Sequence, residues 1–126
     1  MLYMFLLYIA PGADFPPDIM ERHLALWREA NAKGAYVSSE ALGTDTAVAR
    51  TVRVRGGRVL TTDGPFAETK EVLGGYYVLD CANLEEALAY AAKIPDALAG
   101  SVEVRPVLHV PDWPYPDSRR RHPMGA

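Results

Sequence analysis

His23 is the side chain of this sequence best suited to acid–base chemistry, because an imidazole changes its charge near neutral pH. Its neighbours at a spacing of three and four residues are Ile19, Met20, Leu26 and Trp27. On a helix these residues surround the ring, so the imidazole is predicted to point into an apolar region. A general acid or base fits that place, and so does a buried histidine that is bonded only to a backbone carbonyl. The residues leave both interpretations open.

Two acidic residues are further candidates. Asp63 stands where a predicted strand ends and the turn Asp63-Gly64-Pro65-Phe66 begins. Its carboxylate can accept the N–H groups of that turn, which is a structural role. It can equally orient a histidine or hold a donor of a bound ligand, since functional residues often lie on loops. Glu40, within a predicted strand, is either an inward-facing acid able to act as a base or an ordinary solvated charge.

Lys70 and Arg105 are the cations that could hold an anionic ligand. Lys70 stands beside Glu71, and surface ion pairs of this kind contribute little to stability. Arg105 alternates with Val104 on a predicted strand, where it could bind a carboxylate or phosphate through its forked guanidinium. The alternative for Arg105 is an ion pair with Glu103 or with a residue of a partner chain.

Other chemistry is not indicated. The histidines His23, His109 and His122 are too scattered to suggest a metal site, and the single Cys81 offers no thiol pair. The sequence has no Gly-rich phosphate loop, so we expect no cofactor. A net charge of −3 makes nucleic acid an unlikely main partner, because phosphate binding needs a cationic excess.

The chain has 126 residues, the size of one domain. A lone cysteine fits a reducing compartment, and we expect the protein in the cytoplasm. The apolar residues 1–9 carry no preceding Lys or Arg and no cleavage site, which argues against a signal peptide. They are also far fewer than the roughly 20 residues needed to cross a bilayer. We therefore predict no membrane association.

Hydrophobic periodicity predicts strands, helices and one hairpin. Residues 2–9 are apolar on both alternating faces, so such a strand must be covered on both sides. Two helices can cover one side in a chain this short, and a second copy of the protein is the simplest cover for the other. The predicted strands are 2–9, 35–42, 75–81 and 102–107, the helices 17–33 and 83–94, and the hairpin 49–55 with 58–62.

Helix boundaries and the tail follow from local signals. Gly34 is a natural end for the first helix, and Asn83 can cap the second with Glu86 reaching back. Residues 1–110 are predicted to form the domain. Residues 111–126 form a Pro/Arg-rich tail that is extended and outside the core, with Trp113 or Tyr115 as the residue that docks it.

Without the hairpin the order is β-α-β-β-α-β, the ferredoxin-like split β-α-β pattern of an α+β protein. Residues 58–80, RVLTTDGPFAETKEVLGGYYVLD, resemble the DGPF segment of the YCII-related proteins. The resemblance extends to residues 3–8 (YMFLLY), 39–42 (SEAL) and 102–107 (VEVRPV), in order. It covers roughly residues 1–108.

The resemblance implies protomers that pair sheet to sheet as a dimeric α/β barrel. Some relatives are suspected enzymes with a His–Asp pair, and the matching residues here are His23 and Asp63. Other relatives accompany or are fused to alternative sigma factors. Two hypotheses follow: a cofactor-independent enzyme or binder of a small polar or anionic molecule, and a non-catalytic dimeric regulatory module associated with a sigma factor.

Overall fold

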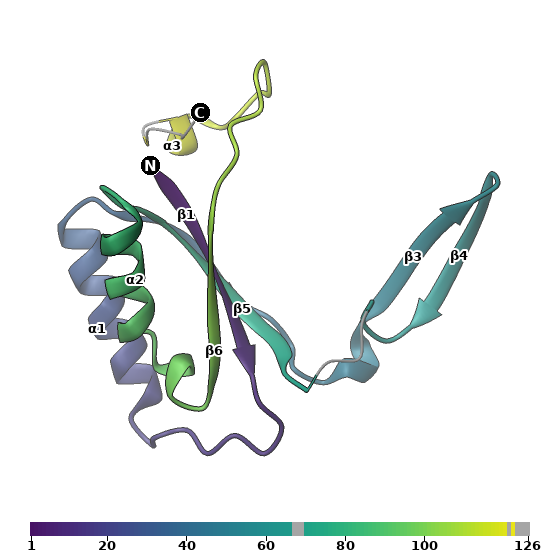
Figure 1. Ribbon diagram of the computed structural model, residues 1–126, viewed down its shortest axis with the longest axis horizontal. Helices are drawn as coiled ribbons and strands as arrows, with labels where there is room; N and C mark the ends of the chain where they lie inside the picture. The colour runs from purple at the N-terminus through teal and green to yellow at the C-terminus, as the bar shows by residue number, and fades with distance from the viewer. Residues whose placement is uncertain (67–69, 121, 123–126) are drawn as a thin grey trace.

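A computed structural model describes residues 1–66, 70–120 and 122 (Figure 1). The α+β class and the β-α-β-β-α-β order, with a hairpin inserted after the second strand, are confirmed. The elements are β1 (Leu2–Ile9), α1 (Ile19–Ala32), β2 (Tyr36–Ala41), η1 (Thr46–Val48), β3 (Arg50–Arg55), β4 (Arg58–Asp63), β5 (Val72–Asp80), α2 (Leu84–Lys93), η2 (Pro95–Leu98), β6 (Gly100–Pro106) and α3 (Asp117–Arg120), where η denotes a 3-10 helix.

Four strands form the main sheet, in the order β2-β5-β1-β6, and all neighbours are antiparallel. Helix α1 connects β1 to β2, and α2 connects β5 to β6. Both helices lie on the same face of the sheet (Figure 1). Strands β3 and β4 pair only with each other and form a separate two-stranded sheet. This strand order is the one that the split β-α-β pattern predicts.

The core lies between the main sheet and the two helices. Alternate residues of β1 point toward the helices, where Tyr3, Phe5 and Leu7 are buried. They pack in one cluster with residues of α1 and α2, including Leu26 and Tyr90. Burial of these large side chains is the main favourable contribution to folding.

The opposite face of the main sheet is not covered by α1 or α2, and we call it the uncovered face (Figure 1). At one end of it Asp80 contacts His122 of the tail. The register places in it the other alternate residues of β1 and their partners on β5. Its partly exposed apolar members are Met4, Leu6, Tyr8 and Tyr76, whereas Val78 is buried.

The helix ends follow the predicted signals closely. Helix α1 ends before Gly34, which has a φ of +71°, a conformation that favours glycine. Asn83 caps α2, since its side-chain oxygen accepts the Glu86 N–H at 2.9 Å. Strand β5, however, begins at Val72, three residues earlier than predicted. Its register with β1 shifts between Leu7 and Tyr8, so the strand continues through a bulge at Gly74.

The tail differs from the extended segment that the sequence predicted. Residues 117–120 form the short helix α3, and His122 Nδ1 lies 3.2 Å from Asp80 Oδ2. The other Asp80 oxygen lies 2.9 Å from the N-terminal ammonium of Met1. Trp113 is exposed, so Asp80 rather than Trp113 connects the tail to the body. No helix within the described ranges is long and apolar enough to cross a bilayer.

Gly100 opens β6 where the strand comes very close to β1. A Cβ atom at this position would lie 2.0 Å from the Tyr8 carbonyl oxygen, a backbone atom that cannot move aside. We therefore expect Gly100→Ala to lower the free energy of unfolding by about 1–3 kcal/mol in urea titrations. Gly43→Ala is the control, because the nearest atom there is 3.8 Å away. Equal stability of the two variants would contradict this close approach.

Cys81 follows β5 and is 1% exposed. Burial, followed by the charges of Glu86 and Asp80, raises the pKa of its thiol to about 11. The thiolate is the reactive form, so we expect no measurable alkylation of the native protein by iodoacetamide at pH 8. Reaction should become complete in unfolding concentrations of urea. Rapid alkylation of the folded protein would show that this segment opens.

Candidate functional site

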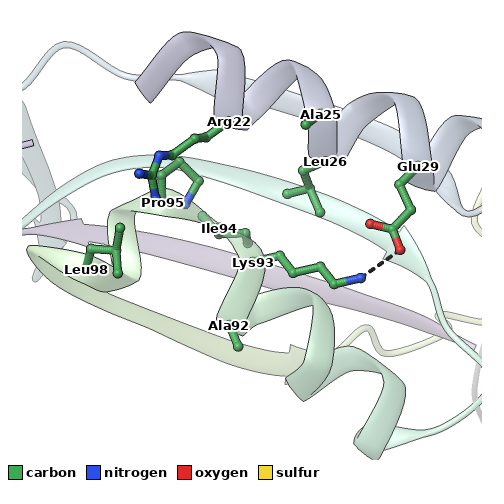
Figure 2. Close-up of a pocket in the computed structure, with 9 residues that line it drawn as sticks. All are labelled: Arg22, Ala25, Leu26, Glu29, Ala92, Lys93, Ile94, Pro95 and Leu98. Carbon is green, nitrogen blue, oxygen red and sulfur yellow. Dashed lines mark hydrogen bonds and ion pairs between the residues drawn. The ribbon is translucent and has the colours of Figure 1, made fainter. Parts of the chain in front are cut away.

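Two hollows adjoin α1. The first is a groove of about 340 Å³ between α1 and the α2–η2 segment (Figure 2). Its charged side chains are already paired: Lys93 donates a 2.7 Å hydrogen bond to Glu29, and Arg22 contacts Asp18 at 3.0 Å. The hydrogen bond from Lys93 lowers the pKa of the Glu29 carboxyl. The groove therefore offers a ligand few unpaired polar groups.

The second hollow is a cavity of about 270 Å³ between the first turns of α1, η2 and the main sheet. Its apolar wall includes Leu7, and Gly74 and Gly75 beside the bulge also line it. Three polar side chains of different elements meet here, from α1, β5 and η2. They are His23, Tyr77 and Asp96, which we call the His23 triad.

The imidazole of His23 joins the other two residues of the triad. Its Nδ1 lies 2.6 Å from the Tyr77 hydroxyl, a hydrogen-bond distance. Its Nε2 lies 2.9 Å from Asp96 Oδ1. The His23 and Tyr77 rings are also nearly parallel, at 17°, with centroids 5.9 Å apart. His23 therefore has side-chain partners on both nitrogens, whereas the structural alternative required only a backbone carbonyl.

Asp96 is a buried carboxylate, with 8% of its side chain exposed. Although Oδ1 is close to the imidazole, it has no partner with hydrogen-bond geometry among the described residues. The two groups thus lie in close contact, in a geometry that is poorly aligned as a hydrogen bond. An incompletely satisfied buried carboxylate is costly, and such groups are more common at functional sites than elsewhere.

Tyr77 stays protonated over the whole physiological range. Burial, and then the charges of Asp96 and Tyr36, raise the pKa of its hydroxyl to about 12. The unfolded chain loses this proton near pH 10, so the hydroxyl favours the folded state below pH 10 and loses that effect between about pH 10 and 12. At neutral pH Tyr77 can therefore donate its hydrogen bond to Nδ1. The neutral imidazole then carries its own proton on Nε2, facing Asp96.

The predicted pairing of His23 with Asp63 is not what the structure shows within one chain. Asp63 ends β4, its side chain is 89% exposed, and its carboxylate lies 3.2 Å from Arg50 Nε. The reason is topological, because β4 belongs to the separate hairpin, whereas η2 packs on α1 and brings Asp96 to His23. Asp96 thus takes the place predicted for Asp63, and a role of Asp63 itself stays a prediction.

The other predicted residues lie outside the His23 triad. Glu40 borders the cavity. It alternates with Ser39 and pairs with Tyr76, which places its side chain on the uncovered face. There the side chain is exposed. Lys70 lines a different hollow, which has no residue in common with the cavity and includes Tyr8 and Ser101.

Arg105 forms the ion pair with Glu103 that was its alternative interpretation, at 2.8 Å. None of the described residues that line the cavity is a lysine or an arginine. In the described parts of the chain, no three His, Cys, Asp or Glu side chains gather in a way that could hold a metal ion.

Sequence reasoning missed Tyr77 and Asp96. Tyr77 had one usable signal. It alternates with Tyr76, so one of these two tyrosines must face the side of the sheet on which the first helix packs. Asp96 had none, because an aspartate after the helix-ending Pro95 resembles any solvated turn residue. Only the packing of η2 against α1 reveals that its carboxylate is buried.

These features define a small α+β protein with a cavity between its first helix and its sheet, at which three polar side chains meet. The family model for the YCII-related domain matches residues 1–112, and the chain belongs to this family. The resemblance predicted from the DGPF segment is thereby confirmed.

An uncharacterized protein of Rhizobium meliloti (strain 1021) is 46% identical over 79 residues. The match covers 57% of this chain and 64% of that relative, slightly less than two thirds of its length. Among solved structures, 5-chloro-2-hydroxyhydroquinone dehydrochlorinase from Burkholderia phenoliruptrix AC1100, in complex with 2,5-dihydroxybenzoquinone, matches with a TM-score of 0.43. The identity is 14%, over 87% of this chain and 96% of that one. A likeness at this level determines neither the fold nor the function of the present chain.

The arrangement of the triad predicts the tautomer of His23. In nitrogen NMR spectra of the neutral imidazole, we expect the proton on Nε2, because the Asp96 carboxylate faces that atom and Tyr77 donates to the other. In Tyr77→Phe the Nδ1 signal should move toward that of a nitrogen without a hydrogen bond, while Nε2 keeps its proton. A dominant Nδ1–H form in the unmodified protein would contradict the arrangement.

Proposed function

We propose that this protein is a cofactor-independent enzyme that transfers protons on a small, uncharged compound, with the His23 triad as its acid–base group. The observation that supports this most directly is His23 held between Tyr77 and a buried Asp96 at the wall of a cavity. Such a chain of three groups is a common way to orient an imidazole for acid–base catalysis.

The triad can pass a proton in one concerted step. A substrate O–H or activated C–H gives its proton to the Tyr77 oxygen, while the Tyr77 proton moves to Nδ1 of His23. The resulting imidazolium lies against the Asp96 carboxylate, which stabilises its charge. With a pKa of about 12, Tyr77 is not deprotonated alone, so it needs His23 to accept its proton. Tyr77 and His23 are then the catalytic residues, and Asp96 positions His23.

The charge of the cavity favours an uncharged ligand over the anionic one that the sequence also suggested. Asp96 is the buried charge at the wall, and no lysine or arginine is among the described lining residues. An anion would approach this carboxylate without a compensating cation, at a high electrostatic cost. A hydroxyl or carbonyl compound can instead bond to Tyr77 and to Ser39, whose hydroxyl already lies 2.6 Å from that of Tyr36.

A homodimer is part of this proposal. The uncovered face carries the partly exposed residues Met4, Leu6, Tyr8 and Tyr76. An apolar surface of this kind is typical of an interface, and a second copy packed sheet to sheet would bury it. This is the dimeric barrel that the family resemblance implies.

The alternative is a regulatory module associated with a sigma factor, which needs neither a cavity nor side-chain partners for His23. A cavity and two side-chain partners on His23 favour the enzyme instead. An association with a sigma factor stays a prediction.

Proton transfer can be tested without knowledge of the natural substrate. We expect the protein to accelerate exchange of the α-protons of cyclohexanone or dihydroxyacetone in D2O, followed by proton NMR. His23→Asn and Tyr77→Phe should each lower this rate by about 100-fold or more, the usual contribution of a general acid–base group. Arg105→Ala is the control outside the cavity and should exchange like the unmodified protein.

Three results would contradict the proposal. The first is no acceleration by the folded protein with either ketone. The second is equal rates in the unmodified protein and His23→Asn. The third is an exchange rate that depends on Arg105 rather than on His23, together with faster exchange of pyruvate than of the uncharged ketones. That result would favour an anionic ligand instead of an uncharged one.

A further inference from the structure

Within the described ranges, the hairpin β3–β4 pairs with no strand of the main sheet. Its two strands of six residues each pair only with each other. Figure 1 shows it standing out from the body on the side of the sheet away from α1 and α2. A two-stranded hairpin by itself is marginally stable in water, so an element of this length needs a surface to pack against.

One face of the hairpin carries three valines, followed by Thr61 and the Arg50–Asp63 ion pair. Val54 lies opposite Val59, and Val52 follows two residues along on the same face. Their exposed fractions are 58%, 69% and 60%, and we call these three residues the valine strip. Aligned β-branched side chains fit a strand that is covered on that face, whereas full exposure to water has no evident benefit.

The other face of the hairpin is basic. Arg53 lies opposite Leu60, and Arg55 lies opposite Arg58. The guanidinium of Arg53 is 5.2 Å from the ring centroid of Phe66, a cation–π distance. The hairpin thus has a basic face and a face with three valines, and burial would stabilise the valine strip.

We propose that the hairpin is a dimer arm, whose valine strip packs on a second copy of this chain seated on the uncovered face. The inference rests on the homodimer of the proposed function and names the segment that completes its interface. The hairpin and the uncovered face lie on the same side of the main sheet (Figure 1). A copy seated on that face therefore comes within reach of the arm.

Charge also favours a second copy as the occupant. The uncovered face bears Glu40 on the edge strand β2, where its side chain is exposed. The arm bears Arg55 and Arg58 at its tip, on each side of the Gly56-Gly57 turn. In a two-fold dimer each arm meets the partner's sheet, so these opposite charges are brought together twice.

The arm is tested by replacing apolar residues with threonine on its two faces. In Val54→Thr/Val59→Thr the strand propensity and shape stay while the apolar contact is lost. We expect its dimer dissociation constant, from sedimentation equilibrium, to rise by about tenfold or more. Leu60→Thr, on the basic face, is the matched control and should stay within about twofold of the unmodified protein, because solvated surface changes have small effects.

Amide hydrogen exchange of the unmodified protein gives a second test that needs no variant. We expect the β3–β4 amides to be protected above the dimer dissociation constant and to exchange freely well below it. Protection that does not change with protein concentration would overturn the proposal, and so would equal dimer affinity of Val54→Thr/Val59→Thr and the control.

The experiment also separates this proposal from the one on which it rests. If the unmodified protein stays a monomer at micromolar concentration, the homodimer fails and the arm with it. If it dimerises and the valine changes have no effect, only the arm fails.

Discussion

The structure depends on the two central strands, β1 and β5, which are apolar on both faces. One face is covered from within the chain, because α1 and α2 bring Leu26 and Tyr90 onto Tyr3, Phe5 and Leu7. The other face presents apolar residues such as Leu6 and Tyr76, which α1 and α2 do not cover. Burial of apolar area drives both folding and association. The same composition that builds the core therefore also predisposes the chain to pair with a copy of itself.

The His23 triad is a consequence of how the covered face is built. Helix α1 carries His23 on the side that faces the sheet, and β5 carries Tyr77 among the core residues. The turn η2 closes the space between them and places Asp96 under the imidazole. Each group is held by packing rather than by a mobile loop, which favours the fixed orientation that acid–base chemistry requires. The bulge at Gly74 borders the adjoining cavity.

Local signals predicted the elements well. The alternation of β1, the glycine at the end of α1 and the Asn83 cap of α2 depend on residues close in sequence, so they can be recognised there. The start of β5 could not, because two consecutive glycines resemble a strand boundary. Only pairing with β1 shows that the strand continues through them. His23 was recognised as a candidate from its helical neighbours, and the Arg105–Glu103 pair was anticipated as an alternative.

The sequence by itself determined the family, the α+β order of elements and the identity of the histidine, because these depend on local patterns and on a long matching segment. Tertiary structure alone decided which carboxylate faces that histidine. Asp63 and Asp96 are both aspartates beside a proline-containing turn, and nothing local distinguishes them. The packing of η2 on α1 buries Asp96 against His23, while the self-contained hairpin leaves Asp63 in solvent. Contacts between segments far apart in the chain made that choice, and such contacts have no signature in a single sequence.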